Sequence, residues 1–568
     1  MKLLTLLGLS AFVFSACAPA ATTPTTTQPA PAPPPTVAVP PAVAETIAVR
    51  EAAENWHLLD VSTAGVHGIG AVRAQSELLQ GRRPARTVVV AVIDGGIDTA
   101  HVDLRGNLWH NPREVAGNSR DDDGNGYADD VRGWNFIGGR DGRSVHHDTY
   151  EVTRLFVACT KGTKGSSPST LSPQERQRCE EIEADFQEER NEAEQTLQQV
   201  QAVDSVLSRA VPLLRQALGT DSLTPEAVTA LRATDAEVQR ARRIYLQLDA
   251  NGITPEAVRE AKEELDARVR FGLNPSYNSR AIVGDDTANL AERRYGNADV
   301  MGPDALHGTH VAGIIGAVQG NSTGIDGVAP AVRIIMVRAV PDGDERDKDV
   351  ANAIRYAVDN GANIINMSFG KGYSPQKRAV DEAVKYADSR GVLIVHAAGN
   401  DGENVDESPS FPTPAFEGSG QAQNWIEVGA SSWKGADSLV APFSNYGRQR
   451  VDVFAPGVDI LSTAPGGGYE RQSGTSMAAP VVSGLAALLM GYYPSLTAAD
   501  VKRIILESAT RLADRQVIRP SSGGTPGTTV PFGTLSATGA IVNAYEAVRM
   551  AEEVSAGRDP AARPAVRP

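Results

Sequence analysis

The feature that most constrains the fold of this chain is an alternation of short apolar runs with amphipathic helical segments. Residues 87–93 form a continuous run of mostly β-branched residues bounded by polar ones, which predicts a buried strand. After residue 281, further strands are predicted at 332–337, 362–367 and 392–396, with helices at 350–360 and 375–390 between them. Strands without polar alternation suit a parallel sheet that is covered on both faces. The pattern therefore predicts an α/β fold with a doubly wound, mostly parallel sheet.

A long helical segment interrupts this pattern. Residues 171–270 are rich in Glu, Gln, Arg and Ala, and apolar residues recur there every seven positions, at Phe186, Ala193, Val200, Leu207 and Leu214. Two near-copies, 223–228 and 253–258, each place Thr at an N-cap and Pro at the first helical position. We expect an inserted helical hairpin or small bundle at 151–280 that packs on itself. A single solvated helix and an arm that contacts partners are the alternatives.

The N-terminus predicts export. Lys2 precedes a short apolar stretch at 3–13, and the sequence Phe-Ser-Ala-Cys around Cys17 resembles a bacterial lipobox. Residues 1–16 would then be a signal peptide, Cys17 would carry lipid, and 17–46, rich in Ala, Pro and Thr, would be a linker. A plain signal peptide is the alternative. Both interpretations place the protein in the cell envelope or outside the cell, and the lipid would anchor it to a membrane.

Cysteine content and charge agree with an exported protein. If Cys17 carries lipid, Cys159 and Cys179 remain to pair as a disulfide in an oxidising compartment. The formal net charge of −15 excludes a general nucleic-acid-binding role, because that role needs a basic face against phosphate. Residues 556–568 are Ala-, Arg- and Pro-rich, and we expect a disordered tail there.

Three motifs carry residues for nucleophilic catalysis. Asp94 ends the strand predicted at 87–93, His307 opens the motif His-Gly-Thr-His-Val-Ala-Gly, and Ser476 lies in Gly-Thr-Ser-Met-Ala-Ala-Pro before an apolar helix. A serine hydroxyl needs an adjacent base, a histidine can be that base, and a buried carboxylate can hold the imidazole in place. Taken singly, a capping aspartate, a structural histidine and a helix-capping serine explain each residue. Together, they indicate a catalytic triad.

These motifs, together with His-Ala-Ala-Gly-Asn ending at Asn400, resemble the subtilisin-like serine peptidases, over residues 88–103 and about 285–509. The resemblance implies a subtilisin-like fold, with 47–150 and 281–555 forming one peptidase domain around the insertion. It also implies that Asn400 completes the oxyanion hole and that Ser368, Phe369 and Gly370 line the S1 and S4 pockets. His310, the second histidine of its motif, is expected to be structural. Over two hundred residues separate Asp94 from His307, far more than simple subtilisins have.

Two acidic segments are open to more than one interpretation. The segment 342–349 carries five acids, and the resemblance places it beside S2 and S4, as a solvated loop or as an element that selects basic substrates. Residues 121–130 resemble the first half of a calcium loop, with Asp121, Asp123, Asn125 and Asp130 as ligands. An acidic, glycine-rich turn is the alternative. Structural calcium is the only cofactor expected, and the chemistry needs none.

Three hypotheses for the function follow. The first is an active serine endopeptidase that hydrolyses exported or extracellular polypeptides through an acyl-enzyme. The second is an inert peptidase fold that serves as a scaffold, with the helical insertion contacting partners. The third is a maturation protease for one dedicated substrate, gated by the insertion. The intact set of motif residues favours an active enzyme.

Overall fold

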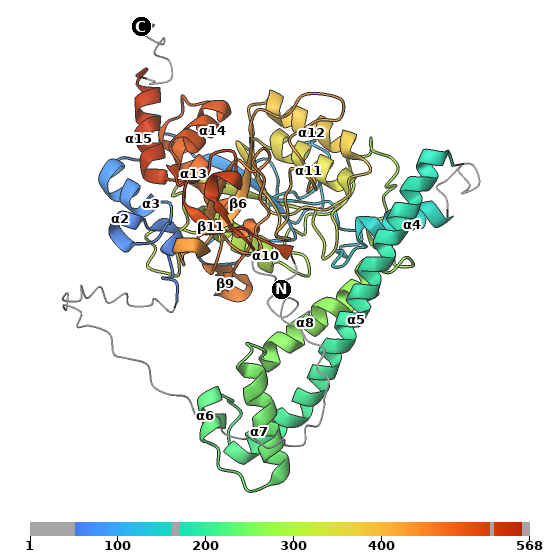
Figure 1. Cartoon of the computed structure of the whole chain (residues 1–568). Coiled ribbons are helices and arrows are strands. Elements are labelled where there is room, and N and C mark those ends of the chain that lie inside the picture. The colour runs from blue at the N-terminus through green and yellow to red at the C-terminus, as the bar shows by residue number, and fades with distance from the viewer. Residues whose placement is uncertain (1–50, 162–170, 523–526, 559–568) are drawn as a thin grey trace, which may run out of the picture.

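The computed structural model describes residues 51–161, 171–522 and 527–558 (Figure 1). The predicted signal peptide, Cys17 and the linker lie outside the described residues, as does nearly all of the predicted C-terminal tail. What the structure describes is an α/β body with a helical segment that projects from it (Figure 1).

The body is built on a nine-stranded sheet. The strand order is β10-β13-β7-β6-β5-β4-β1-β3-β2, and every neighbouring pair is parallel except β10 and β13. In chain order, the strands are β1 (Val88–Asp94), β2 (Gly133–Asn135), β3 (Val332–Arg338), β4 (Ile364–Met367), β5 (Leu393–Ala397), β6 (Trp425–Ser431), β7 (Val453–Pro456), β10 (Thr510–Arg511) and β13 (Ala540–Ile541). The four strands predicted from apolar runs are confirmed as β1, β3, β4 and β5.

Helices cover both faces of the sheet. One face packs against α10 (Leu306–Gly316), α13 (Thr475–Tyr492), α14 (Ala498–Glu507) and α15 (Ala544–Ser555), and the other against α11 (Asp347–Asp359) and α12 (Lys377–Ser389). Alternate residues of β1 enter the two cores, Val90 on one side and Ala91 on the other. This two-sided burial explains why the strand sequence has no polar alternation, and it confirms the predicted doubly wound sheet. Helix α13 is long and apolar enough to cross a membrane, but it is the buried core helix of this body.

The remaining elements of the body are short. Two antiparallel ribbons pair β8 (Ile460–Ala464) with β9 (Gly468–Gln472) and β11 (Gln516–Ile518) with β12 (Thr529–Pro531). The N-terminal part and the connections contain η1 (Trp56–Leu58), α2 (Val61–Ala64), α3 (Ala71–Arg73), η2 (Ala74–Leu78), α9 (Arg280–Val283), η5 (Ala436–Ser438), η6 (Pro465–Gly467) and η8 (Phe532–Thr534).

The helical segment is the predicted insertion. It contains α4 (Glu151–Lys161), α5 (Pro173–Leu218), α6 (Pro225–Ala230), α7 (Ala236–Asp249), α8 (Pro255–Ala267) and η4 (Arg268–Gly272). All five heptad residues of α5 are buried, and Thr224 and Thr254 cap α6 and α8 as expected. Helices α7 and α8 pack back onto α5, which is 46 residues long and extends away from the body (Figure 1). The insertion therefore packs on itself, as the heptad pattern predicts.

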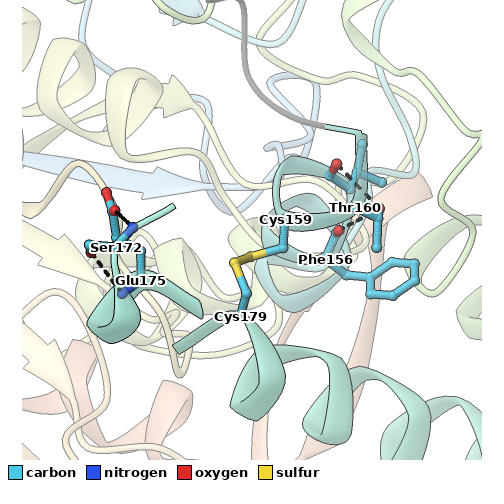
Figure 2. Close-up of a disulfide and its surroundings, with 7 residues drawn as sticks. Phe156, Cys159, Thr160, Ser172, Glu175 and Cys179 are labelled. Atoms are coloured by element: carbon cyan, nitrogen blue, oxygen red, sulfur yellow. Dashed lines mark hydrogen bonds between the residues drawn. A yellow bond between two sulfur atoms is a disulfide. The ribbon is translucent and has the colours of Figure 1, made fainter. Parts of the chain in front are cut away.

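A disulfide joins the first two helices of the insertion. Cys159 on α4 is bonded to Cys179 in the first turns of α5, with the two Cα atoms 5.6 Å apart (Figure 2). The side chain of Ser172 caps α5 and Glu175 returns the bond to the Ser172 backbone, so the start of the long helix is fixed beside the disulfide (Figure 2). The disulfide thus joins the second half of α4 to the first turns of α5.

Candidate active site

The order in which the chain adds strands to the sheet reverses beside β1, and the site lies at this point. Strand β1 pairs with β3 on one side and with β4 on the other, and the chain crosses from β3 to β4. In open α/β sheets, ligands bind beyond the carboxyl ends of the strands at such a switch point. Asp94 is the last residue of β1 and is buried, so its carboxylate lies at this position.

Asp94 holds the imidazole of His307. The two carboxylate oxygens lie 2.8 and 2.9 Å from His307 Nδ1, and Oδ1 also accepts a hydrogen bond of 2.7 Å from the backbone N–H of Gly95. His307 lies in the first turn of α10, and its side chain is 42% exposed. The carboxylate is therefore fixed and buried, while the histidine ring reaches the surface where a substrate would lie.

The electrostatic environment favours the charged form of His307. Burial lowers its pKa, but the negative charge of Asp94 and the hydrogen bond that His307 donates to that carboxylate outweigh burial, and Asp304 adds to the effect. The net result is a pKa above the usual 6.5. A histidine with this environment is a stronger base, and its protonated form is stabilised after it accepts a proton.

Ser476 lies in the first turn of α13, next to Asn400. The Asn400 side-chain oxygen accepts hydrogen bonds from the backbone N–H of Thr475 (2.8 Å) and from its hydroxyl (3.1 Å). These two bonds fix the orientation of the Asn400 amide beside the start of the helix. An oxyanion that formed at Ser476 would therefore meet an amide donor and the positive end of the α13 dipole.

The Ser476 hydroxyl donates a hydrogen bond to the carbonyl oxygen of Ser368, at 3.1 Å. The Ser368 hydroxyl in turn donates to the carbonyl oxygen of Ser476, at 3.0 Å. Among the described residues, no hydrogen bond joins Ser476 to His307. The structure thus joins Asp94 to His307 and joins Ser476 to the segment after β4. Attack by Ser476 would require its hydroxyl to turn from Ser368 toward the imidazole.

The expected substrate-binding residues Ser368, Phe369 and Gly370 follow β4 directly. Ser368 is buried, Phe369 is half-buried and Gly370 is exposed. His396 Nε2 lies 2.8 Å from the Phe369 carbonyl oxygen, and the Glu427 carboxylate holds the other ring nitrogen of His396 at 2.8 Å. The contacts of His396 with Glu427 and with Phe369 hold the backbone of the segment in place. His310 likewise contacts two backbone carbonyls, of Ile460 and Glu470, and burial lowers its pKa to about 4, as suits a structural residue.

The acidic segment 342–349 differs from both expectations. Glu345, Asp347 and Asp349 are buried, and the last two belong to α11. Asp349 bonds Arg280 at 2.7 Å, and Asp347 pairs with Lys371 at 2.9 Å. These three acids are therefore neither solvated nor placed to face a substrate, whereas Asp342 is exposed and Asp344 is half-buried. Arg280 and Lys371, both distant in sequence, compensate the cost of burying Asp349 and Asp347.

The predicted calcium loop is only partly assembled as expected. Asp123 and Asp130 lie together with Glu114, and one carboxylate oxygen of each falls within 4.8 Å of the others. Asp121 is not in this group: its oxygens accept the backbone N–H groups of Asn125 and Gly126 and so shape the turn. The Asn125 amide contacts Asp130 at 3.0 Å. The pattern missed Glu114, because it precedes the loop on a segment with no repeating acids.

The electrostatics of this acidic group suit a hard cation. Burial raises the pKa of Asp130 to about 6, and the charge of Asp123 adds to the rise. A second group, His146, His147 and Asp342, also brings donor atoms within 4.8 Å of one another, and no sequence pattern indicated it. Because calcium prefers oxygen ligands, only the first group fits it.

Comparisons with known proteins agree with this geometry. Residues 85–524 match the model of the family described as the subtilase family, Peptidase_S8. The chain is 43% identical over 217 residues to a thermophilic serine proteinase from Bacillus sp. (strain AK1), which covers 38% of this chain and 48% of that relative. It is 36% identical over 246 residues to Subtilisin DY from Bacillus licheniformis, covering 43% of this chain and 82% of the relative.

The protease domain of PatA, solved as a mutant, is 31% identical, with a TM-score of 0.35 and coverage of 44% of this chain and 82% of that one. The chain spans about half the length of the thermophilic proteinase and 82% of Subtilisin DY. The family match covers most of the chain, and the motifs lie within it. The chain belongs to the subtilase family of serine endopeptidases.

Proposed function

We propose that this chain is an exported serine endopeptidase in which Ser476 is the nucleophile, His307 the general base and Asp94 the residue that orients it. The observation that carries this proposal is the pair of contacts between Asp94 and His307 Nδ1 at the carboxyl end of β1. Those contacts direct the other ring nitrogen of His307 away from Asp94, where it can take the proton from a serine hydroxyl.

The remaining roles follow from the same geometry. Asn400, fixed by Thr475, would donate its amide to the oxyanion of the tetrahedral intermediate. Ser368, Phe369 and Gly370 would pair with the substrate backbone as an added strand, in the manner of peptide recognition at a sheet edge. Polypeptides are therefore the proposed substrates, and the chemistry needs no metal.

Substitution at the site tests this proposal. Ser476→Ala should abolish hydrolysis of a denatured protein, and Asn400→Ala should keep the fold but lower kcat by about 10²–10³-fold. Ser389→Ala, at an exposed serine on α12, is the matched control and should leave activity unchanged. Hydrolysis that persists in Ser476→Ala would show that the nucleophile is another residue.

Export and lipidation complete the proposal, supported by the N-terminal sequence alone. A palmitate analogue should label the wild-type chain, and Cys17→Ser should not be labelled. Protein that is unlabelled and free in the medium would instead indicate a plain signal peptide. The helical insertion, which extends away from the body, is the proposed surface for partner contacts.

Calcium is a further proposal, supported by the three carboxylates of Glu114, Asp123 and Asp130. The ion would neutralise these carboxylates, and it would link the loop to the segment that carries Glu114. Chelation with EGTA should lower Tm, and Asp130→Asn should remove the effect of chelation. An EGTA-insensitive Tm in the wild type would exclude structural calcium at this group.

A further inference from the structure

A cleft of about 560 Å³ lies between the helical insertion and the predicted substrate-binding segment. The body contributes Gly370, which ends that segment, and Asp401, which follows Asn400. The insertion and its start contribute Tyr150, Glu189 and Arg268. The cleft therefore lies next to residues of the candidate active site, and one of its walls belongs to the insertion.

The charged groups that line the cleft are mostly acidic. They are four carboxylates, Glu189, Asp344, Asp401 and Glu403, and two cations, Arg268 and Lys371. Lys371 is buried and is held by carboxylates that do not line the cleft, Glu151 at 2.7 Å and Asp347 at 2.9 Å. Glu151 and Asp347 thus neutralise the charge of Lys371 from outside the cleft, and the cleft surface that a ligand meets is negative.

Glu189 and Asp344 are only partly compensated within the protein. Arg268 approaches Glu189 only to 3.4 Å, and Asp344 accepts one hydrogen bond of 2.7 Å, from the backbone N–H of Glu151. Burial raises the pKa of both carboxyl groups, and Asp344 adds to the rise at Glu189. A cation placed between them would relieve this repulsion.

We propose that this cleft is a subsite for a lysine or arginine side chain of the polypeptide substrate, on the N-terminal side of the scissile bond, and that Glu189 of the insertion and Asp344 select it. The inference rests on the proposed peptidase function. The cleft has more than enough room for a long side chain, and it lies beside the segment proposed to pair with the substrate backbone. The insertion is then a specificity element of the enzyme.

Ion pairs and a disulfide hold the part of the insertion that lines the cleft. Glu151 of α4 bonds Lys371 of the body at 2.7 Å and Arg154 at 2.6 Å, and the Cys159–Cys179 disulfide joins α4 to α5. These contacts position Glu189 before a substrate binds. A preorganised carboxylate loses less entropy on binding a cation than a free one would.

Matched fluorogenic peptides test the proposal. Each set carries Lys, norleucine or Glu at one of the four positions before the scissile bond and is otherwise identical. At one position, kcat/KM for Lys should exceed that for norleucine, and the Glu peptide should be the poorest. Raising ionic strength should reduce the preference, because salt screens it.

Substitutions then assign the preference to the cleft. Glu189→Gln should lower the Lys-to-norleucine ratio by about two- to fivefold, the scale of one partly exposed charge pair. Glu189→Lys should reverse the order of the Lys and Glu peptides. Glu188→Gln, at the neighbouring exposed residue of α5, is the matched control and should keep the wild-type ratio.

The outcomes separate this inference from the proposed function. Equal turnover of Lys and norleucine peptides at every position would overturn the inference while leaving the peptidase intact. The same loss in Glu188→Gln and Glu189→Gln would also overturn it, because it would show a general effect of net charge. No turnover of any peptide, together with no labelling of Ser476, would instead contradict the proposed function.

Discussion

At the scale of single residues, we expect the contact between Asp94 and His307 to set the pH dependence of the proposed activity. Because the net effect raises the pKa of His307 above 6.5, the base is protonated and inactive over a wider acidic range than a free histidine would be. We expect the acidic limb of kcat/KM to fall with a midpoint above pH 6.5.

Variants of the two nearby acids test this cause. Asp94→Asn should shift the acidic limb to lower pH and lower kcat by about 10⁴-fold, since the negative charge is lost and an amide, which can also donate, no longer fixes the imidazole tautomer. Asp304→Asn, which removes the weaker contribution, should shift the limb less and in the same direction. An acidic limb that does not move in Asp94→Asn would contradict this assignment.

Glu345 makes a separate prediction at this scale. Its side chain is buried, Oε1 has no hydrogen-bond partner in the part of the chain that the structure describes, and burial raises its pKa from 4.5 to about 8. Between these values the folded chain keeps a proton that the unfolded chain has lost, so the free energy of unfolding falls as pH rises from 4.5 to 8. Glu345→Gln should remove this slope and stabilise the protein at pH 8 by about 1–3 kcal/mol, with little change at pH 4.

Denaturant unfolding at pH 4, 6 and 8 measures the slope. Glu188→Gln, a charge-neutralising change at an exposed site, should show the wild-type pH dependence. Equal stability of Glu345→Gln and wild type at pH 8 would show that Glu345 is ionised without cost in the folded protein.

At the scale of elements, sequence patterns predicted helices and strands better than they predicted partners. The heptad residues Phe186 and Leu214 are buried because helix periodicity is a local property of the chain. Strand β6 was not predicted, because Glu427 interrupts its apolar run. The folded structure explains this carboxylate in the sheet by its contact with His396. The buried acids of 345–349 were misassigned for the same reason: their cations are distant in sequence.

The junction between α4 and the body contains the buried ion pair of Glu151 with Lys371. Arg154 and Lys371 outweigh the effect of burial and lower the pKa of Glu151 to about 2. A lowered pKa contributes stability above the unfolded value, and this stability is lost as pH falls toward 2. Glu151→Gln should cost about 3 kcal/mol at neutral pH, because Lys371 keeps only part of its compensation.

Urea unfolding and hydrogen exchange of α4 measure this loss. The exposed pair of Arg378 and Glu382 on α12 is the control, and Arg378→Gln there should cost less than about 1 kcal/mol. Unchanged stability and unchanged exchange of α4 in Glu151→Gln would show that the insertion is held to the body by other contacts.

At the scale of the whole molecule, the insertion separates Asp94 from His307 by 213 positions without separating them in space. The sheet makes this possible, since Asp94 is fixed by β1 and His307 by α10, and both lie in the same body. The order of the motifs was therefore enough to predict that Asp94 and His307 lie together, whereas the cleft beside the candidate site was not predictable. That cleft needs Glu189 and Asp344, which share no motif and meet only in the folded chain.

The disulfide gives a prediction at this scale. Replacing Cys159 and Cys179 together by Ala should lower the free energy of unfolding by about 3 kcal/mol, the expected entropy for a loop of this length. The Lys preference of the peptidase should also weaken, because Glu189 would lose part of its support. A variant with wild-type stability and preference would show that packing alone fixes the insertion.

The most direct test of the account is the site of covalent attack. A fluorophosphonate probe applied to the purified protein, followed by peptide mass spectrometry, should place a single adduct on Ser476, and His307→Ala should abolish it. An adduct on another serine, or hydrolysis that continues after Ser476 is fully modified, would contradict the assignment of Asp94, His307 and Ser476 as the catalytic residues.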